Sequence, residues 1–136
     1  MAKYDEGFAR NIRKIFGPGD LYDGFAGRKL KSVILSNDKE TIAFEFQDGY
    51  VAKFGAEGDC CSTSWIEHLT VPDDIEGQEL VEAIDECIGT EDVPDGYTYR
   101  QVYQTKLRTD KGETITIEYR NDSNGYYGGY LVRLEN

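Results

Sequence analysis

The sequence has few cysteine and histidine residues, no long apolar run and no common catalytic or nucleotide-binding motif. Its 136 residues include three cysteines and one histidine, which is too little cysteine for a disulfide framework and favours a reducing cytoplasm. No apolar run approaches the roughly 18–20 residues that span a bilayer, and residues 1–16 lack the apolar core of a signal peptide. P-loop, G-x-G-x-x-G, paired zinc and serine-elbow motifs are also missing. We therefore expect a cytoplasmic protein with no membrane association, no cofactor and no enzymatic activity.

Positive charge is missing from the middle of the chain. Between Glu57 and Asp95 there are thirteen acidic residues and no lysine or arginine, within a chain of net charge -11. Such a segment repels nucleic-acid phosphates and attracts basic surfaces. The alternative is a solvated acidic surface that only maintains solubility.

Alternating apolar and polar residues predict strands in two regions. "ETIAFEF" from Glu40 and "ETITIEY" from Glu113 each follow a lysine-bearing turn and precede a tyrosine-led strand. Alternate residues then face one apolar side, as in half-buried antiparallel strands. We predict an antiparallel sheet of two similar β-meanders, over residues 29–56 and 97–134, with about six strands. Its predicted core comprises Ile34, Ile42, Phe44, Phe46, Val51, Phe54, Leu107, Ile115, Ile117, Tyr119, Leu131 and Leu134.

Helical spacing predicts two helices outside the meanders. An N-terminal helix over residues 1–17 is indicated by Phe8, Ile12, Ile15 and Phe16. A short helix within the acidic linker, residues 57–96, is indicated by Leu80, Val81, Ile84, Cys87 and Ile88. A strand over residues 83–88 is the alternative, because so short a segment does not distinguish the two periods. The sequence thus predicts a single α+β domain over residues 1–136.

Two ordered motifs carry a resemblance to a known family. "GDCCSTSW" at residues 58–65 and "IEYRNDSNGYYGG" at residues 117–129 resemble a family of small proteins of unknown function from bacteriophage and prophage genomes. The resemblance covers residues 30–134. It implies a small α+β fold, a phage setting and the host-cell cytoplasm as compartment, and it supplies no catalytic residues.

The adjacent Cys60 and Cys61 raise the question of a reactive or metal-binding centre. A disulfide between neighbours needs a strained ring, and in a strand the two side chains would point to opposite faces. A zinc site from Cys60, Cys61, His68 and Cys87 lacks paired C-x-x-C clips. A Cys61 nucleophile activated by His68 would have its pKa raised by the acidic neighbours. We favour a structural role, with one cysteine in the core and the other in a turn.

The glycine- and tyrosine-rich segment is a second candidate site. Gly128 and Gly129 within a strand indicate a bulge, or the close approach of another backbone or of a flat ligand. A nucleotide stacked on tyrosines is one such ligand, and its site would comprise Arg120, Asn124, Tyr126, Tyr127, Gly128 and Gly129. Ordinary sheet surface and core is the alternative role for these tyrosines.

From these patterns we expect a non-enzymatic, phage-type effector that binds and inhibits a host protein. The host protein would have a basic, nucleic-acid-binding surface, which the acidic effector occupies as a DNA mimic in an anti-defence or anti-CRISPR-like role. The effector itself would not bind nucleic acid, and its oligomeric state is open, a homodimer included. The alternatives are a small-ligand binder that sequesters a nucleotide signal and a cysteine- or zinc-centred protein. The expected partner-binding residues are Glu76, Glu79, Glu82, Asp85, Glu86, Glu91 and Asp92.

Overall fold

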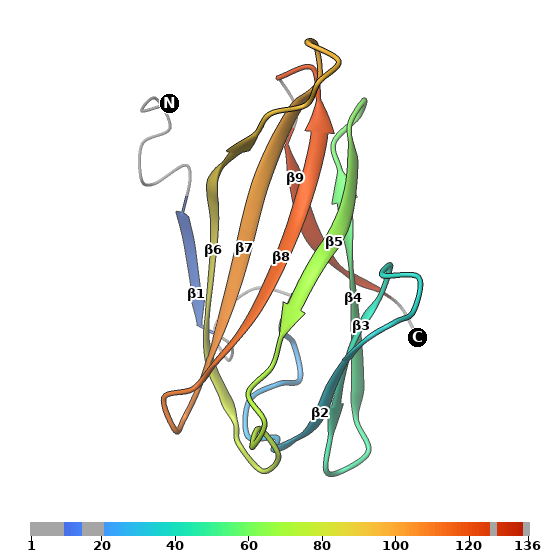
Figure 1. Ribbon diagram of the computed structural model, residues 1–136. Coiled ribbons are helices and arrows are strands. Elements are labelled where there is room, and N and C mark those ends of the chain that lie inside the picture. The colour runs from blue at the N-terminus through green and yellow to red at the C-terminus, as the bar shows by residue number, and fades with distance from the viewer. Residues whose placement is uncertain (1–9, 15–20, 126–127, 135–136) are drawn as a thin grey trace.

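Two antiparallel β-sheets stack against each other in the computed structural model, which describes residues 10–14, 21–125 and 128–134 (Figure 1). One sheet has five strands in the order β1-β6-β7-β8-β5, and the other has four in the order β2-β3-β4-β9. No helix occurs in these ranges, and hence none that could cross a membrane. The strands are β1 (Arg10–Lys14), β2 (Leu30–Leu35), β3 (Ile42–Phe46), β4 (Val51–Gly58), β5 (Thr63–Thr70), β6 (Leu80–Glu91), β7 (Tyr99–Thr109), β8 (Thr114–Ser123) and β9 (Gly129–Leu134).

The expected α+β fold is wrong, because the described part of the chain is all-β. Of the helix expected over residues 1–17, residues 10–14 form strand β1, and the others lie outside the described residues. β1 runs antiparallel to β6, with Arg10 opposite Glu86 and Ile12 opposite Ile84. Such pairing joins segments that are far apart in the sequence, so local helical spacing does not reveal it.

The helix expected around residues 80–88 is also wrong, and the alternative of a strand over residues 83–88 is confirmed, since this segment belongs to the long strand β6. The register of β6 against β7 shifts between Leu80 and Glu82, which marks a bulge or irregularity. An extra residue at that point leaves the buried Leu80 and Ala83 three positions apart instead of two. An irregular strand therefore imitates the spacing of a helix.

Strands β2, β3 and β4 occupy the region where the first meander was predicted. Ile42, Phe44 and Phe46 alternate with half-buried residues along β3, as the sequence pattern indicated. The second predicted meander is different, because β9 does not pair with β8. It crosses to the other sheet and pairs with β4. Two strands of the acidic segment belong to the five-stranded sheet instead. β5 pairs with β8, and β6 pairs with β7.

The core lies between the sheets and contains a cluster of aromatic rings. Phe25, from the connection before β2, has its ring centroid 5.3 Å from that of Phe44 and 5.1 Å from that of Phe46. Most of the predicted core residues are buried, but Val51 and Leu134 are half-buried and Ile34 is 49% exposed. The register of β2 shifts between Leu30 and Ser32, so Val33 rather than Ile34 faces the core.

Candidate functional site

The two sequence motifs meet at one end of the sandwich. Ser64 on β5 donates a hydrogen bond from Oγ to Oδ1 of Asn121 on β8, over 2.6 Å. Asn121 is fully buried, and its Nδ2 donates to Oε1 of Gln101 on β7 at 3.4 Å. The backbone N–H of Asp59 donates to the carbonyl of Gly128 over 3.0 Å. The motifs therefore form one polar cluster, in which the backbone N–H of Gly129 on β9 donates to the hydroxyl of Tyr103 on β7 over 3.3 Å and so links the two sheets.

The glycines of these motifs are required by close packing within the protein. A Cβ atom on Gly129 would overlap Ser64 Oγ and lie 2.9 Å from Asn121 Cβ. A Cβ atom on Gly128 would lie 2.9 Å from the hydroxyl of Tyr103. An added side chain would force these neighbouring atoms to move, and the atoms that approach the two glycines belong to protein side chains rather than to another backbone.

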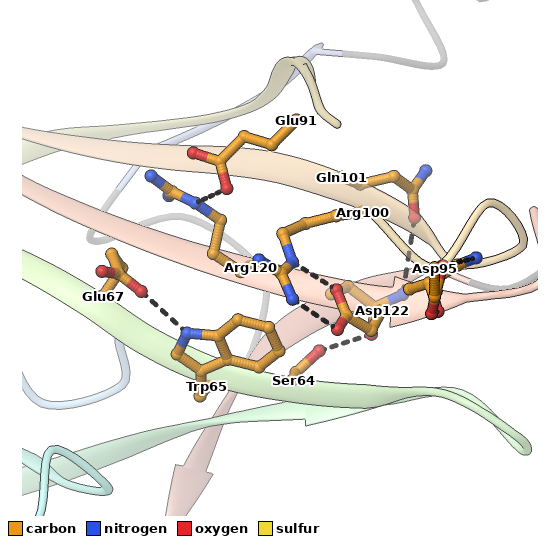
Figure 2. Close-up of polar contacts among 11 residues, drawn as sticks. Ser64, Trp65, Glu67, Glu91, Asp95, Arg100, Gln101, Arg120 and Asp122 are labelled. Atoms are coloured by element: carbon orange, nitrogen blue, oxygen red, sulfur yellow. Dashed lines mark hydrogen bonds and ion pairs between the residues drawn. The ribbon is translucent and has the colours of Figure 1, made fainter. Parts of the chain in front are cut away.

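Arg120, expected to face a ligand, is instead enclosed by carboxylates. Its side chain is 9% exposed, and its Nε lies 3.3 Å from Oε1 of Glu91 (Figure 2). Its Nη1 lies 3.4 Å from Oε1 of Glu118. Of the remaining residues of that candidate site, Asn124 is exposed in the turn after β8, whereas Tyr126 and Tyr127 lie outside the described residues.

A second ion pair lies beside Arg120 on the outer face of the five-stranded sheet. Arg100 donates from Nε and Nη2 to the two carboxylate oxygens of Asp122, over 2.7 and 2.9 Å. Its guanidinium carbon lies 5.1 Å from the ring centroid of Trp65. The indole Nε1 of Trp65 donates to Oε1 of Glu67 over 2.8 Å, and this hydrogen bond holds the pKa of Glu67 below its ordinary value. Figure 2 shows this row of side chains running from β7 across β8 to β5.

The seven acidic residues expected to bind a partner are spread along β6 and the loops at its two ends. Glu82 pairs with Arg108 at 2.9 Å, Glu91 pairs with Arg120, and Glu79 accepts a hydrogen bond from the backbone N–H of Gly27 at 3.0 Å. Asp85 accepts from the hydroxyl of the buried Thr105, on the core side of the sheet. Glu86 is half-buried, and only Glu76, Glu91 and Asp92 of the seven are exposed.

Acidic side chains gather instead around a groove with a volume of about 640 Å³. It lies between β4 and β5, beside the turn that joins β2 to β3 and the end of β9. Four carboxylates and a single lysine surround it, namely Asp38, Glu40, Glu57, Glu67 and Lys39. Its apolar lining comprises Ala56, Trp65, Ile66, Val132 and Leu134. Sequence reasoning missed this site because its walls come from four separate segments.

Two strand edges open onto the groove. Among the described residues, β5 is the last strand of its sheet and pairs only with β8. β3 pairs with β4 only as far as Phe54. Beyond it, residues 55–58 of β4 pair with β9 on one side and with no strand on the other in the described structure. Unpaired backbone N–H and C=O groups at such edges are ready to pair with another extended chain. The groove thus combines apolar surface, negative charge and strand edges.

The cysteine residues do not gather with the histidine. Cys60 and Cys61 lie in the exposed turn between β4 and β5, whereas Cys87 is half-buried on β6. His68 is exposed on β5. No group of three or more metal-ligating side chains that could hold an ion occurs in the part of the chain that the structure describes. The expectation that one of the adjacent cysteines is a core residue is wrong, since both are exposed.

Comparison with known proteins places the chain in a family. A family model described as Domain of unknown function (DUF7448) matches residues 12–132, and the chain therefore belongs to this family. The match extends further towards the N-terminus than the resemblance expected over residues 30–134, and it includes part of β1. No curated protein and no solved structure matches the chain.

Proposed function

We propose that this DUF7448 domain is a non-enzymatic binding module that holds an extended, basic segment of a partner protein in the groove between β4 and β5. The observation that carries this proposal is the groove itself, with four carboxylates and one lysine around two strand edges. A peptide that adds to a strand edge gains affinity from main-chain hydrogen bonds and specificity from its side chains. Lysine or arginine side chains of such a peptide would meet the carboxylates of the groove.

Charge supports a basic partner over an acidic one. The whole chain carries a net charge of -11, so a basic partner is attracted at long range and a nucleic acid is repelled. Around the groove, hydrogen bonds from Ser36 and from Trp65 lower the pKa of Asp38 and of Glu67, respectively. Both groups are therefore ionised at neutral pH. Association is expected to be fast and to weaken with added salt.

The resemblance to bacteriophage proteins favours a more specific form of this proposal. The partner would be a host protein whose basic segment ordinarily contacts nucleic acid, and the domain would inhibit it by occupying that segment. In this form the carboxylates of the groove, and not the seven acidic residues on and beside β6, take the place of nucleic-acid phosphates. A photoreactive amino acid at position 57 should cross-link to a lysine- or arginine-rich segment of a host protein. Cross-links at position 76 alone would place the contact outside the groove.

Binding of a defined peptide tests the proposal directly. A fluorescent peptide of about eight alternating lysine and valine residues has the length of a typical strand, and fluorescence anisotropy measures its affinity. We expect Glu40→Lys combined with Glu57→Lys to weaken binding by about tenfold or more, which is about 1.4 kcal/mol or more. Both positions are exposed, so folding should be retained.

The matched control makes the same change in net charge away from the groove. Asp73→Lys combined with Glu76→Lys alters two exposed residues in the loop between β5 and β6. We expect this control to weaken binding no more than about twofold, through long-range charge alone. Equal losses in the two variants would contradict a groove site. A wild-type dimer that dissociates in the groove variant would show that a second copy occupies the groove.

A further inference from the structure

The turn between β4 and β5 brings two thiols together. Cys60 has a φ of 22°, in the left-handed region that residues other than glycine seldom adopt. In an extended strand, adjacent side chains point to opposite faces, but here the Sγ atoms of Cys60 and Cys61 are 2.7 Å apart. Both residues are exposed at the end of the sandwich. The turn therefore presents a pair of accessible thiols, whereas a strand would separate them.

The surrounding cluster holds this turn in place. The backbone N–H of Ser62 donates to the carbonyl of Asp59 over 2.8 Å, which closes the turn around the two cysteines. Ser62 Oγ donates to the same carbonyl over 2.7 Å. The N–H of Asp59 is bonded to the carbonyl of Gly128 on the approach to β9. Both ends of the dithiol turn are thus fixed by hydrogen bonds.

We propose that Cys60 and Cys61 form a vicinal dithiol site that chelates a soft, thiophilic centre with two open bonding positions, such as an organic arsenic(III) group. Two thiols held side by side bind such a centre more tightly than two independent thiols, because the second bond forms within one molecule. A tetrahedral zinc site needs further ligands, whereas an aryl-arsenic(III) centre is complete with one carbon and two sulfurs.

The chemistry balances without an oxidant. In the reaction of phenylarsine oxide with the dithiol, the arsenic–oxygen bond breaks and two arsenic–sulfur bonds form. The two thiol protons leave with the oxygen as one molecule of water. The hydrogen bond from Cys61 raises the pKa of the Cys60 thiol, so Cys60 enters the reaction with its proton and releases it as its bond to arsenic forms.

Retention of phenylarsine oxide against competing thiols tests this site. Intact-mass spectrometry should show one arsenical per folded chain, resistant to excess 2-mercaptoethanol and removed by 2,3-dimercaptopropanol. Cys60→Ser and Cys61→Ser should each abolish resistance to the monothiol. Cys87→Ser should retain it, since Cys87 lies on β6 outside the turn. Removal of the wild-type adduct by the monothiol, or its persistence in either single-serine variant, would overturn the proposal.

The contribution of the fold is measured separately. If the turn pre-positions the sulfurs, unfolding in guanidinium should lower the dimercaptopropanol concentration that strips the arsenical, by about tenfold or more. Equal concentrations for folded and unfolded protein would show that sequence adjacency alone makes the site. That result would overturn the structural basis inferred here. This site is independent of the peptide groove, so either can fail without the other.

Discussion

Ser64 and Asn121 are joined by a 2.6 Å hydrogen bond between neighbouring strands, and each belongs to a different one of the two sequence motifs. Asn121 is fully buried, so its amide depends on partners within the protein. The relationship explains why two motifs separated by a long acidic segment belong together. They form the junction where the chain passes from one sheet to the other.

Removing this hydrogen bond should destabilise the fold. We expect Asn121→Ala to lower the free energy of unfolding by about 1–3 kcal/mol, because Ser64 and Gln101 lose a buried partner. Urea denaturation of Asn121→Ala, Ser64→Ala and the double variant measures the coupling between the two residues. A coupling energy of about 0.5 kcal/mol or more is expected for residues in contact. Strictly additive losses would mean that the contact does not stabilise the protein.

Gly129→Ala should destabilise the protein through a steric overlap. The added Cβ would meet Ser64 Oγ and Asn121 Cβ, and relieving the overlap should cost about 1–3 kcal/mol. The effect should be smaller in a Ser64→Ala background, since one of the two obstructing atoms is then gone. Thermal denaturation of the wild type, the two single variants and the double variant tests this, and an equal loss in both backgrounds would rule out the overlap with Ser64.

Glu67 should make the environment of Trp65 sensitive to acid. The indole hydrogen bond lowers the pKa of Glu67 from its ordinary value of 4.5. The stability that the ionised Glu67 contributes is therefore complete above pH 4.5, and it is lost as pH falls through the lower pKa of the folded state. Trp65 is the only tryptophan, and its emission should change in this acidic range. Glu67→Gln should remove that transition. An unchanged transition in the variant would assign it to another group.

Lysine substitutions along β6 distinguish the groove from the surface that the sequence indicated. The sequence alone predicts that Glu79→Lys, Glu82→Lys and Glu86→Lys together abolish partner binding. β6 is separated from β5 by two other strands, so we expect affinity for the lysine–valine peptide to fall far less than in the Glu40→Lys, Glu57→Lys variant. Losing the ion pair of Glu82 with Arg108 should reduce stability by about 1 kcal/mol or less. Complete loss of peptide binding with the fold intact would favour the β6 surface.

The alternation of apolar and polar residues in the sequence predicted the regular strands of the fold. The buried Ile42, Phe44 and Phe46 follow the period of an ordinary strand, and so their strand was recognisable. For β6 a strand over residues 83–88 was only the alternative to a helix, because the register shift gives the buried residues Leu80 and Ala83 a helix-like separation. The pairing of β1 with β6 and of β9 with β4 depends on contacts between distant segments, which no local period encodes.

At the candidate sites, too, the sequence predicted local features but not the contacts between distant segments. Gly128 and Gly129 predicted a bulge or the close approach of another backbone or a flat ligand, but not the side chains of Ser64 and Asn121 that lie against Gly129. The side-by-side thiols of Cys60 and Cys61 depend on the turn between β4 and β5, in which the two sulfurs lie 2.7 Å apart. The groove combines the β2–β3 turn with β4, β5 and β9, and it exists only once both sheets have formed.

Amide hydrogen exchange, measured by NMR with and without the lysine–valine peptide, tests strand addition at the groove most directly. If the peptide pairs with the free edge of β5, outward-facing amides within residues 64–67 should exchange more slowly in its presence, and their resonances should shift. The amides of residues 73–76, in the loop between β5 and β6, should be unaffected. Slowed exchange in that loop or along β6, with none in β5, would contradict a peptide-binding groove between β4 and β5.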